Sequence, residues 1–234
     1  MLDDFFPCNF WNGKILFDTT SDREIWALLL EKIYAKMHGG YANIAWGLGR
    51  YSFVDLTGAP SLFWGINAKS LAHEITKHWH NLHKSDQRNY AIVALTRNLS
   101  GDGKDGISAG SGIVSNHYYT VVGCVDLNFT GGNFKLLKIR NPWGKGEWKG
   151  KWSDRDPVWK NPEVQTIIPH ENKNNGAFWM DFEDFQKYFK GYNVCYLKKG
   201  YSDANYKLEL QESKPYVFKF EVKSGATRWF GLHQ

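Results

Sequence analysis

Cysteine is scarce in this chain. Its three cysteines, Cys8, Cys124 and Cys195, are an odd and widely separated set, which does not make a disulfide framework. The first residues, Met1 to Asp4, have neither the basic start nor the apolar stretch of a secretory signal. We therefore expect a reducing intracellular compartment, the cytoplasm.

Long apolar runs and an excess of one charge are also missing. The longest apolar runs, Ile25 to Leu30 and Tyr90 to Leu95, have six residues each, whereas a membrane-spanning helix needs about 20. The 29 basic and 24 acidic residues are spread along the chain, so the net charge of +5 is not concentrated into a patch. We expect no membrane span and no nucleic-acid partner.

Apolar and aromatic residues, in contrast, are abundant. They make up 42% and 16% of the chain, with 11 tryptophans. So much ring surface does not stay solvated, which excludes a disordered chain. A length of 234 residues fits one well-cored domain and a fragment, or two small domains, since domains run to roughly 100–150 residues. We interpret the chain as one full unit and a stub.

Two helices are predicted in the first part of the chain. Ser21 to Glu24 forms a capping box, which predicts a helix over about 22–38, ended by Gly39 and Gly40. Its apolar residues at helical spacing are Ile25, Leu28, Leu29, Ile33 and Met37. A second helix is predicted after Asn67, with Leu71, Ile75, Trp79 and Leu82 as its buried stripe. The four histidines of that helix, His73, His78, His80 and His83, lack a zinc spacing and are interpreted as solvated surface.

The rest of the unit has a β pattern. Strands are predicted at 90–96, 117–126 and 133–140, the last two joined by a turn at 128–132. A strand at 177–181, a short helix at 182–189 and a strand at 192–197 complete it. The glycine-rich segment 100–112 is expected to be a mobile loop. Past Gly200, alternating residues such as Phe218, Phe220 and Val222 predict the opening of a second β domain that the sequence does not complete.

One pair of residues indicates a specific chemistry. His117 opens an apolar strand, and the run Arg140 to Gly144 (RNPWG) follows the next strand. A β-hairpin would bring His117 and Asn141 together. Asn141 could then accept a hydrogen bond from one imidazole nitrogen while the other faces a thiol, with Trp143 at a spacing suited to shielding.

These motifs resemble the second half of the protease core of calpains, calcium-activated papain-like cysteine endopeptidases. The matching blocks lie in the segments 140–154 (RNPWG, EW, GKWSD) and 176–180 (GAFWM), with further matches over 31–41 and 55–58. The similarity covers about 6–199. It implies an α+β fold: a papain-like β-rich half-domain, with an antiparallel sheet or barrel and two or three helices, followed by the start of a β-sandwich domain. The implied domains are 1–200, the His/Asn-bearing subdomain of the protease core, and 201–234, an incomplete β-sandwich segment.

The resemblance also implies roles for site residues. His117 would be the general base and acid, Asn141 would orient it, and Trp143 would shield it. Calpains carry the nucleophilic cysteine in a preceding subdomain, in a Gly-Asp-Cys-Trp type segment, with a glutamine for the oxyanion hole. Neither segment occurs in this sequence. Cys8, Cys124 and Cys195 are expected to be small buried apolar residues, so no nucleophile is assigned.

A calcium site is implied with a reduced set of ligands. Two acidic positions of the family site match Glu147 and Asp154, but the other two are Asn175 and Ala177 in this sequence. Losing two carboxylates removes charge and ligands together, so calcium affinity should fall steeply or vanish. The alternative interpretation is that Glu147 and Asp154 are surface acids near a turn.

The sequence therefore predicts the His/Asn half of a calpain-type calcium-dependent cysteine endopeptidase, which hydrolyses peptide bonds of protein or peptide substrates. Alone it should be inactive, because the Cys-bearing subdomain must be supplied in cis or in trans. The alternative is a non-catalytic protease-like module that acts in protein–protein binding or regulation.

Overall fold

The computed structural model describes residues 3, 5–16, 24–67, 72–99, 110–170, 172–200, 217, 219 and 221. They belong to two compact units, Met1–Leu48 and Gly49–Gln234, and each unit is described by itself. The predicted β-sandwich segment 201–234 and most of the glycine-rich loop lie outside the described residues. Both therefore stay predictions.

The first unit is built on helix α1 (Trp26–Met37), which a short 3-10 helix, η1 (Tyr41–Ile44), follows. The predicted helix is confirmed, but it begins at Trp26, because Glu24 and Ile25 are not helical; residues 21–23 of the capping box lie outside the described residues. Its end is a Schellman motif: Gly40 N–H donates to Ala35 O at 2.7 Å and Gly39 N–H to Lys36 O at 3.3 Å. Gly39 has a φ of +84°, which glycine adopts without strain.

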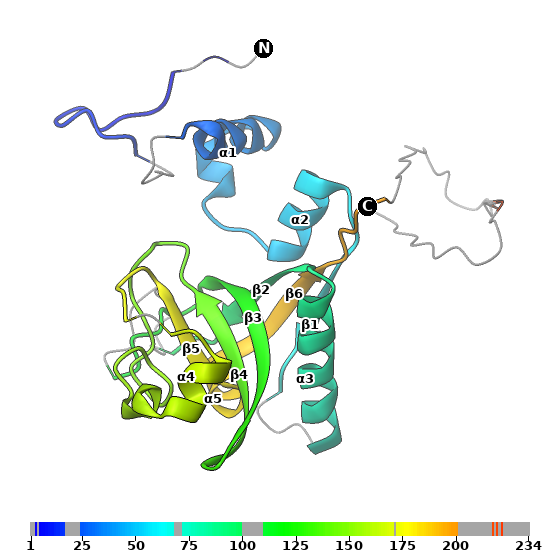
Figure 1. Ribbon diagram of the computed structural model, residues 1–234. Coiled ribbons are helices and arrows are strands. Elements are labelled where there is room, and N and C mark those ends of the chain that lie inside the picture. Colours follow the sequence, from blue (N-terminus) through cyan, green and yellow to red (C-terminus); the bar gives the residue numbers. More distant parts are fainter. Residues whose placement is uncertain are drawn as a thin grey trace. The chain divides into compact units, whose positions relative to one another are not determined.

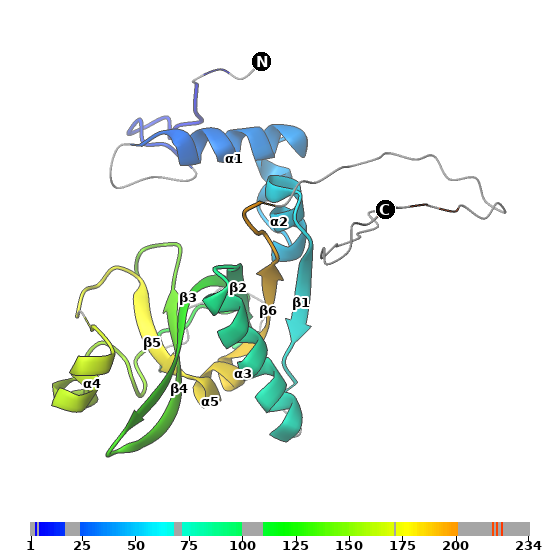
Figure 2. The same cartoon turned by 45° about the vertical axis from the view of Figure 1, so that its right-hand side comes forward.

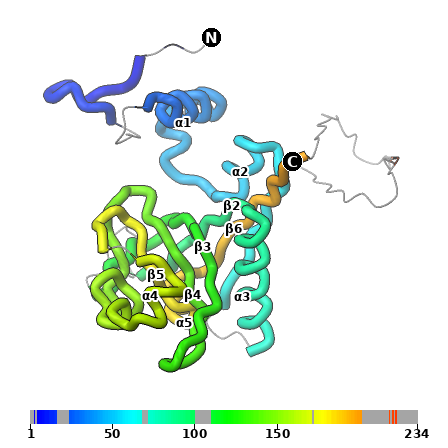
Figure 3. The backbone as a smooth tube through the Cα atoms, viewed as in Figure 1, coloured from blue at the N-terminus to red at the C-terminus, as the bar shows by residue number. Residues whose placement is uncertain are grey.

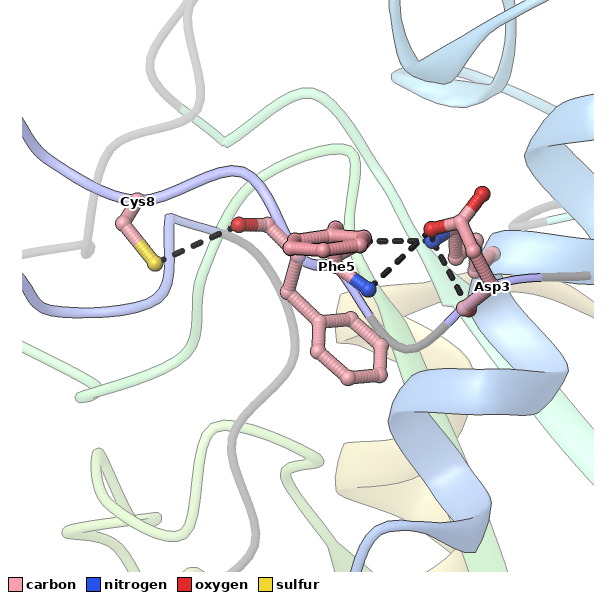
Figure 4. Close-up of polar contacts among 5 residues, drawn as sticks. Asp3, Phe5 and Cys8 are labelled. Atoms are coloured by element: carbon pink, nitrogen blue, oxygen red, sulfur yellow. Dashed lines mark hydrogen bonds and ion pairs between the residues drawn. The ribbon is translucent and has the colours of Figure 1, made fainter.

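Lys32 attaches the N-terminal segment to α1. Its ammonium group binds the carboxylate of Asp3 and the carbonyl oxygen of Phe5, and donates to Asp3 O at 2.9 Å. The contacts of this segment are drawn in Figure 4, where the Cys8 thiol donates to the Phe6 carbonyl oxygen at 3.3 Å. Cys8 also pairs with Ile15 in an isolated β-bridge, so the segment forms a small closed loop.

The second unit contains a six-stranded sheet in the order β1-β6-β2-β3-β4-β5, with every neighbouring pair antiparallel (Figure 1). The strands are β1 (Ser61–Gly65), β2 (Ala91–Thr96), β3 (Tyr118–Phe129), β4 (Gly132–Arg140), β5 (Ala177–Asp181) and β6 (Phe189–Cys195). The predicted α+β class with an antiparallel sheet is confirmed, and the sheet is open rather than closed into a barrel.

In the described part of this unit, five helices accompany the sheet. They are α2 (Gly49–Thr57), α3 (Ala72–Gln87), the 3-10 helix η2 (Pro157–Lys160), α4 (Pro162–Ile167) and α5 (Phe182–Tyr188). Helix α3 packs against β2 and β3 (Figure 2), and its predicted stripe is buried at Trp79 and Leu82. Two helical histidines are not the solvated residues that were predicted. His78 is partly buried, with its Nδ1 3.3 Å from the Tyr192 hydroxyl, and His83 is partly buried, with its Nε2 3.8 Å from Asp126 Oδ2.

Two buried clusters form the core of this unit. The larger one lies between α3, α5 and the sheet, around Leu82, Ile92, Ile139 and Phe185. The smaller one is rich in tryptophan and contains Leu127, Leu136, Trp152, Trp159, Val164, Ile168 and Trp179. It fills the long excursion of the chain between β4 and β5, which also carries α4 (Figure 3). Two tryptophans of the 140–154 block are thus core residues: Trp148 in the larger cluster and Trp152 in the smaller one.

Two boundaries in this unit differ from the prediction. Strand β3 continues to Phe129, so the hairpin turn is shorter than predicted and lies at residues 130–131. The last strand is Phe189–Cys195 instead of 192–197, because residues from Phe189 onward already pair with β2. Among the described residues, no helix combines the length and the apolar character needed to cross a bilayer.

Candidate active site

Two paired strands place the predicted catalytic pair. The β3–β4 hairpin pairs Thr120 with Arg140, so His117, just before β3, and Asn141, just after β4, lie at the same end of the sheet. His117 Nε2 is 3.0 Å from Asn141 Oδ1. The hairpin therefore brings the two residues together as the sequence predicted.

Asn141 is fully buried, and its side chain has hydrogen-bond partners at both ends. Its Nδ2 donates to the carbonyl oxygen of Lys145 at 2.8 Å, and its Oδ1 accepts from Trp143 N–H at 3.1 Å. Its backbone N–H donates to Gly176 O at 2.8 Å. Because the amide nitrogen faces carbonyl oxygens, the oxygen is the atom that faces His117.

This arrangement decides which nitrogen of His117 carries the proton. Asn141 Oδ1 only accepts hydrogen bonds, so Nε2 of His117 must be the donor. In the neutral ring, Nδ1 then holds the lone pair. A general base needs this tautomer if its proton donor lies on the Nδ1 side.

Aromatic rings cover the imidazole. The indole of Trp143 lies over it, with 4.3 Å between ring centroids and 40° between planes, and Tyr119 meets it edge-on at 5.2 Å. Trp143 is 52% exposed, so its other face is turned to solvent. The ring stands where it can keep water from the His117–Asn141 bond, which a less polar surrounding strengthens.

Thr96, the last residue of β2, fixes the backbone of His117. Thr96 N–H donates to His117 O at 3.0 Å, and His117 N–H donates to Thr96 Oγ1 at 2.8 Å. The hydroxyl in turn donates to Val114 O at 2.7 Å, and the side chain is completely buried. The sequence analysis missed this residue. A threonine at the inner end of a predicted strand was its only signal.

Glu147 and the residues near it form a second polar group at this end of the unit. Glu147 Oε1 accepts from Asn175 N–H at 2.9 Å and from Gly176 N–H at 2.8 Å. Asn175 Oδ1 accepts from Ala177 N–H at 2.9 Å.

Asp154 is buried, with its Oδ1 3.8 Å from His170 Nε2. A cavity of about 60 Å³ is lined by Lys138, Asp154, Pro169, His170, Asn175, Ala177, Phe178 and Trp179.

Comparison with known proteins identifies the family of this arrangement. The model of the family described as "Calpain family cysteine protease" matches residues 1–196. The chain belongs to the calpain family. It is 30% identical over 199 residues to calpain-9 of Rattus norvegicus and 32% identical over 203 residues to the calpain-2 catalytic subunit of Gallus gallus. It is also 33% identical over 199 residues to the calpain-type cysteine protease DEK1 of Zea mays.

The matches cover most of this chain but a small part of its relatives. They span 84% of the chain and 28% of rat calpain-9, 84% and 27% for the chicken protein, and 83% and 9% for the maize protein. The calpain-family chain thus spans just over a quarter of the length of the first two relatives.

Two of the three cysteines of this calpain-family chain lie away from His117. Cys124 is buried within β3, seven residues along an extended strand, or about 23 Å from His117. Burial, with Asp86 and Asp126 nearby, raises the pKa of its thiol far above the usual range. Cys195 is buried at the end of β6 and pairs with Ala91, the end of β2 opposite Thr96. Neither thiol can reach the imidazole.

Cys8 differs from its prediction. It was expected to be buried, but it is exposed in the N-terminal segment of the first unit. The neighbouring rings of Phe10 and Trp11 also face solvent, so they do not form an apolar cluster that buries the thiol.

The residues present do not fit a calcium ion. Calcium takes six to eight oxygen ligands, of which carboxylates supply the charge. Here two carboxylates remain, and burial together with the charge of Glu147 raises the pKa of Asp154 to about 6. Lys138 and His170 line the cavity beside Asp154. Within the described part of the chain, no group of three or more His, Cys, Asp or Glu is arranged to hold a metal ion.

Proposed function

We propose that this chain supplies the His/Asn half of a calpain-type cysteine endopeptidase site that acts on protein or peptide substrates. His117 is the general base and acid, Asn141 orients its ring, and Trp143 shields their hydrogen bond. The observation that supports this most is the 3.0 Å contact between His117 Nε2 and the buried Asn141 Oδ1. In that tautomer Nδ1 is the ring nitrogen that can take a proton from a thiol.

In the proposed reaction, His117 Nδ1 takes the proton of a cysteine thiol, and the thiolate attacks the peptide carbonyl carbon. The peptide bond breaks as His117 returns the proton to the leaving amine, and a thioester remains. Water, deprotonated by the same nitrogen, then hydrolyses the thioester. Asn141 Oδ1 accepts from Nε2 throughout, so the ring keeps its orientation when it becomes positively charged.

The nucleophile is proposed to come from a Cys-bearing subdomain outside these 234 residues, in cis or in trans. The burial of Cys124 and Cys195 supports this. Helix α1 also has an apolar stripe at helical spacing, formed by Trp26, Leu30, Ile33 and Met37, which are 40–64% exposed. Large exposed apolar patches mark interaction sites. The calcium requirement of the predicted enzyme finds no support in the ligand set of this half.

The test uses the purified chain with an unfolded protein substrate. Alone it should show no thiol-dependent cleavage, since losing the nucleophile from such a site costs about 10⁶-fold in turnover. Adding the Cys-bearing subdomain of a relative, such as the chicken calpain-2 catalytic subunit, should produce cleavage that His117→Ala abolishes. Cleavage by the chain alone that an alkylating reagent stops would overturn the missing nucleophile.

The same experiment addresses the alternative, a non-catalytic module. If the added subdomain binds the chain tightly but no cleavage follows, while the His117–Asn141 bond is intact, the binding role is favoured over the catalytic one.

A further inference from the structure

We propose that Glu147 is a positioning residue for Asn141 and that it does this without a metal ion. Its carboxylate holds the backbone at residues 175–176 against the Asn141 loop. The proposal rests on the proposed function, because the role of Asn141 comes from there. It assigns to Glu147 a task that differs from the cation ligand implied by the family resemblance.

Three consecutive hydrogen bonds join Glu147 to the imidazole. Gly176 N–H donates to Glu147 Oε1 at 2.8 Å. Asn141 N–H donates to Gly176 O at 2.8 Å, and Asn141 Oδ1 lies 3.0 Å from His117 Nε2. Glu147 therefore fixes the same peptide segment to which the backbone of Asn141 is bonded.

The contact between Gly176 and the Asn141 loop is too close to absorb a shift. A Cβ at Gly176 would lie 2.8 Å from Asn141 O and 3.0 Å from Gly144 backbone atoms. Protein interiors are close-packed and transmit strain, so a shift of one of these segments is passed to the other. If the 175–176 segment moves, Asn141 loses its backbone partner.

Glu147 is itself held in place from the other side. A Cβ at Gly112 would lie 2.1 Å from Glu147 O, so the two backbones are in direct contact. Lys149 N–H donates to Ser111 O at 3.0 Å, and the Asn141 side chain donates to Lys145 O at 2.8 Å. The carboxylate thus extends from a fixed backbone to the 175–176 segment.

Backbone N–H donors occupy the position beside this carboxylate that a bound cation would otherwise take. Two backbone N–H groups point at Glu147 Oε1, and a metal ion would compete for the same lone pairs. Asn175 Oδ1 accepts from Ala177 N–H, so it serves the backbone of its own loop. Near Asp154, positive charge comes from the chain itself: Lys138 lowers the pKa of that carboxyl against the larger effect of burial.

The experiment compares Glu147→Gln with Glu147→Ala in the full chain. Glutamine keeps an Oε1 acceptor but loses the charge, whereas alanine loses the acceptor. The measurements are hydrogen exchange of the Asn141 and Gly176 amides and the NMR signal of the His117 Nε2 proton. We expect Glu147→Gln to retain both, and Glu147→Ala to speed the two amides about five-fold or more, since a net hydrogen bond is worth about 1 kcal/mol.

A matched control is Glu163→Ala. Glu163 also accepts a backbone N–H, that of Thr130 at 2.8 Å, on the exposed start of α4. The Glu163→Ala variant should leave the His117 signal and the hydrogen exchange of the Asn141 and Gly176 amides unchanged. Unchanged exchange and an unchanged His117 signal in Glu147→Ala would overturn the proposal.

Calcium chloride at millimolar concentration supplies the second arm. The melting temperature and the His117 signal of the wild-type chain should not respond to it. A calcium-dependent rise in melting temperature that Glu147→Gln abolishes would show a metal ligand instead and overturn the proposal. These readouts follow hydrogen bonds and not proteolysis. A chain that shows the Glu147 effect but stays inactive after the Cys-bearing subdomain is added therefore counts against the proposed function alone.

Discussion

At the residue scale, His117 is held both by its ring and by its backbone. Asn141 binds the ring nitrogen, and Thr96 binds the backbone N–H and C=O. Tyr119 adds a further support, because its hydroxyl accepts from Val114 N–H at 2.9 Å in the segment that leads to His117. The imidazole can therefore keep one tautomer and one direction, which a base in a hydrogen-bonded relay requires.

Two substitutions at Thr96 should separate the contribution of its hydroxyl to stability from that of its shape. Thr96→Val removes the hydroxyl that accepts from His117 N–H and donates to Val114 C=O, and the loss of these buried hydrogen bonds should cost about 1–3 kcal/mol of unfolding free energy. Thr96→Ser keeps the hydroxyl and should lose less than about half of that. Urea denaturation measures both, and the His117 ring signal should shift in the valine variant only. Equal effects of the two variants would contradict the role of the hydroxyl.

The three cysteines should react very differently with iodoacetamide. Cys8 is exposed, whereas Cys124 and Cys195 are buried and Cys124 has a raised thiol pKa. In the native chain at pH 8, mass spectrometry should find one rapidly labelled thiol, at Cys8, and three after denaturation. Rapid native labelling of Cys124 would contradict the packing of β3.

The partly buried His78 should make stability depend on pH. Burial lowers the pKa of His78 below its ordinary value of 6.5. Below that pH the unfolded chain binds a proton that the folded chain does not, so stability falls as the solution is acidified through this range. His78→Gln should reduce the loss of unfolding free energy between pH 7.5 and pH 5.5. His80→Gln, at an exposed position of the same helix, is the control and should not reduce this loss.

At the scale of elements, the loop before β5 should be sensitive to a single methyl group. Gly176 has a φ of +81° and no room for a Cβ, so Gly176→Ala should destabilise the chain by about 1–3 kcal/mol. Gly200 has the same φ of +81° with open space around it. Gly200→Ala therefore measures the backbone cost alone. A similar loss of unfolding free energy in both variants would show that the contact with Asn141 adds nothing.

The periodic elements could be predicted from the sequence, and the elements that depend on distant partners could not. The stripe of α3 and the β3–β4 hairpin carry their own pattern, so they were found. Strand β1 has exposed residues at three of five positions and exists because it pairs with β6, more than 120 residues later. Helix α2 buries none of its nine residues, which gives it no apolar stripe to recognise.

The same distinction applies to the site. The His117–Asn141 pair could be predicted, because one hairpin joins the two positions. The roles of Thr96 and Gly176 could not, since both residues act through hydrogen bonds to the backbone of segments distant in sequence, and no local pattern predicts those contacts.

At the scale of the whole molecule, the apolar stripe of α1 should govern association. Its residues Trp26, Leu30, Ile33 and Met37 are exposed, and Leu28 and Ala35 are the buried residues of the helix. Changing Ile33→Glu together with Met37→Lys should lower binding of a hydrophobic dye and raise the monomeric fraction in size-exclusion chromatography. Lys14→Glu, an exposed change in the same unit, is the control. Unchanged dye binding in the double variant would show that the stripe is already covered.

The strand order has a consequence for synthesis on the ribosome. Strand β6 is the last of the described strands but lies between β1 and β2, and β1 pairs with no other strand among the described residues. At 5–20 residues per second, about 120 residues separate the emergence of β1 from that of its partner, or roughly 6–25 seconds. During that time β1 has an unpaired edge available to other chains. A nascent chain that stalls before Phe189 would keep this edge of β1 unpaired.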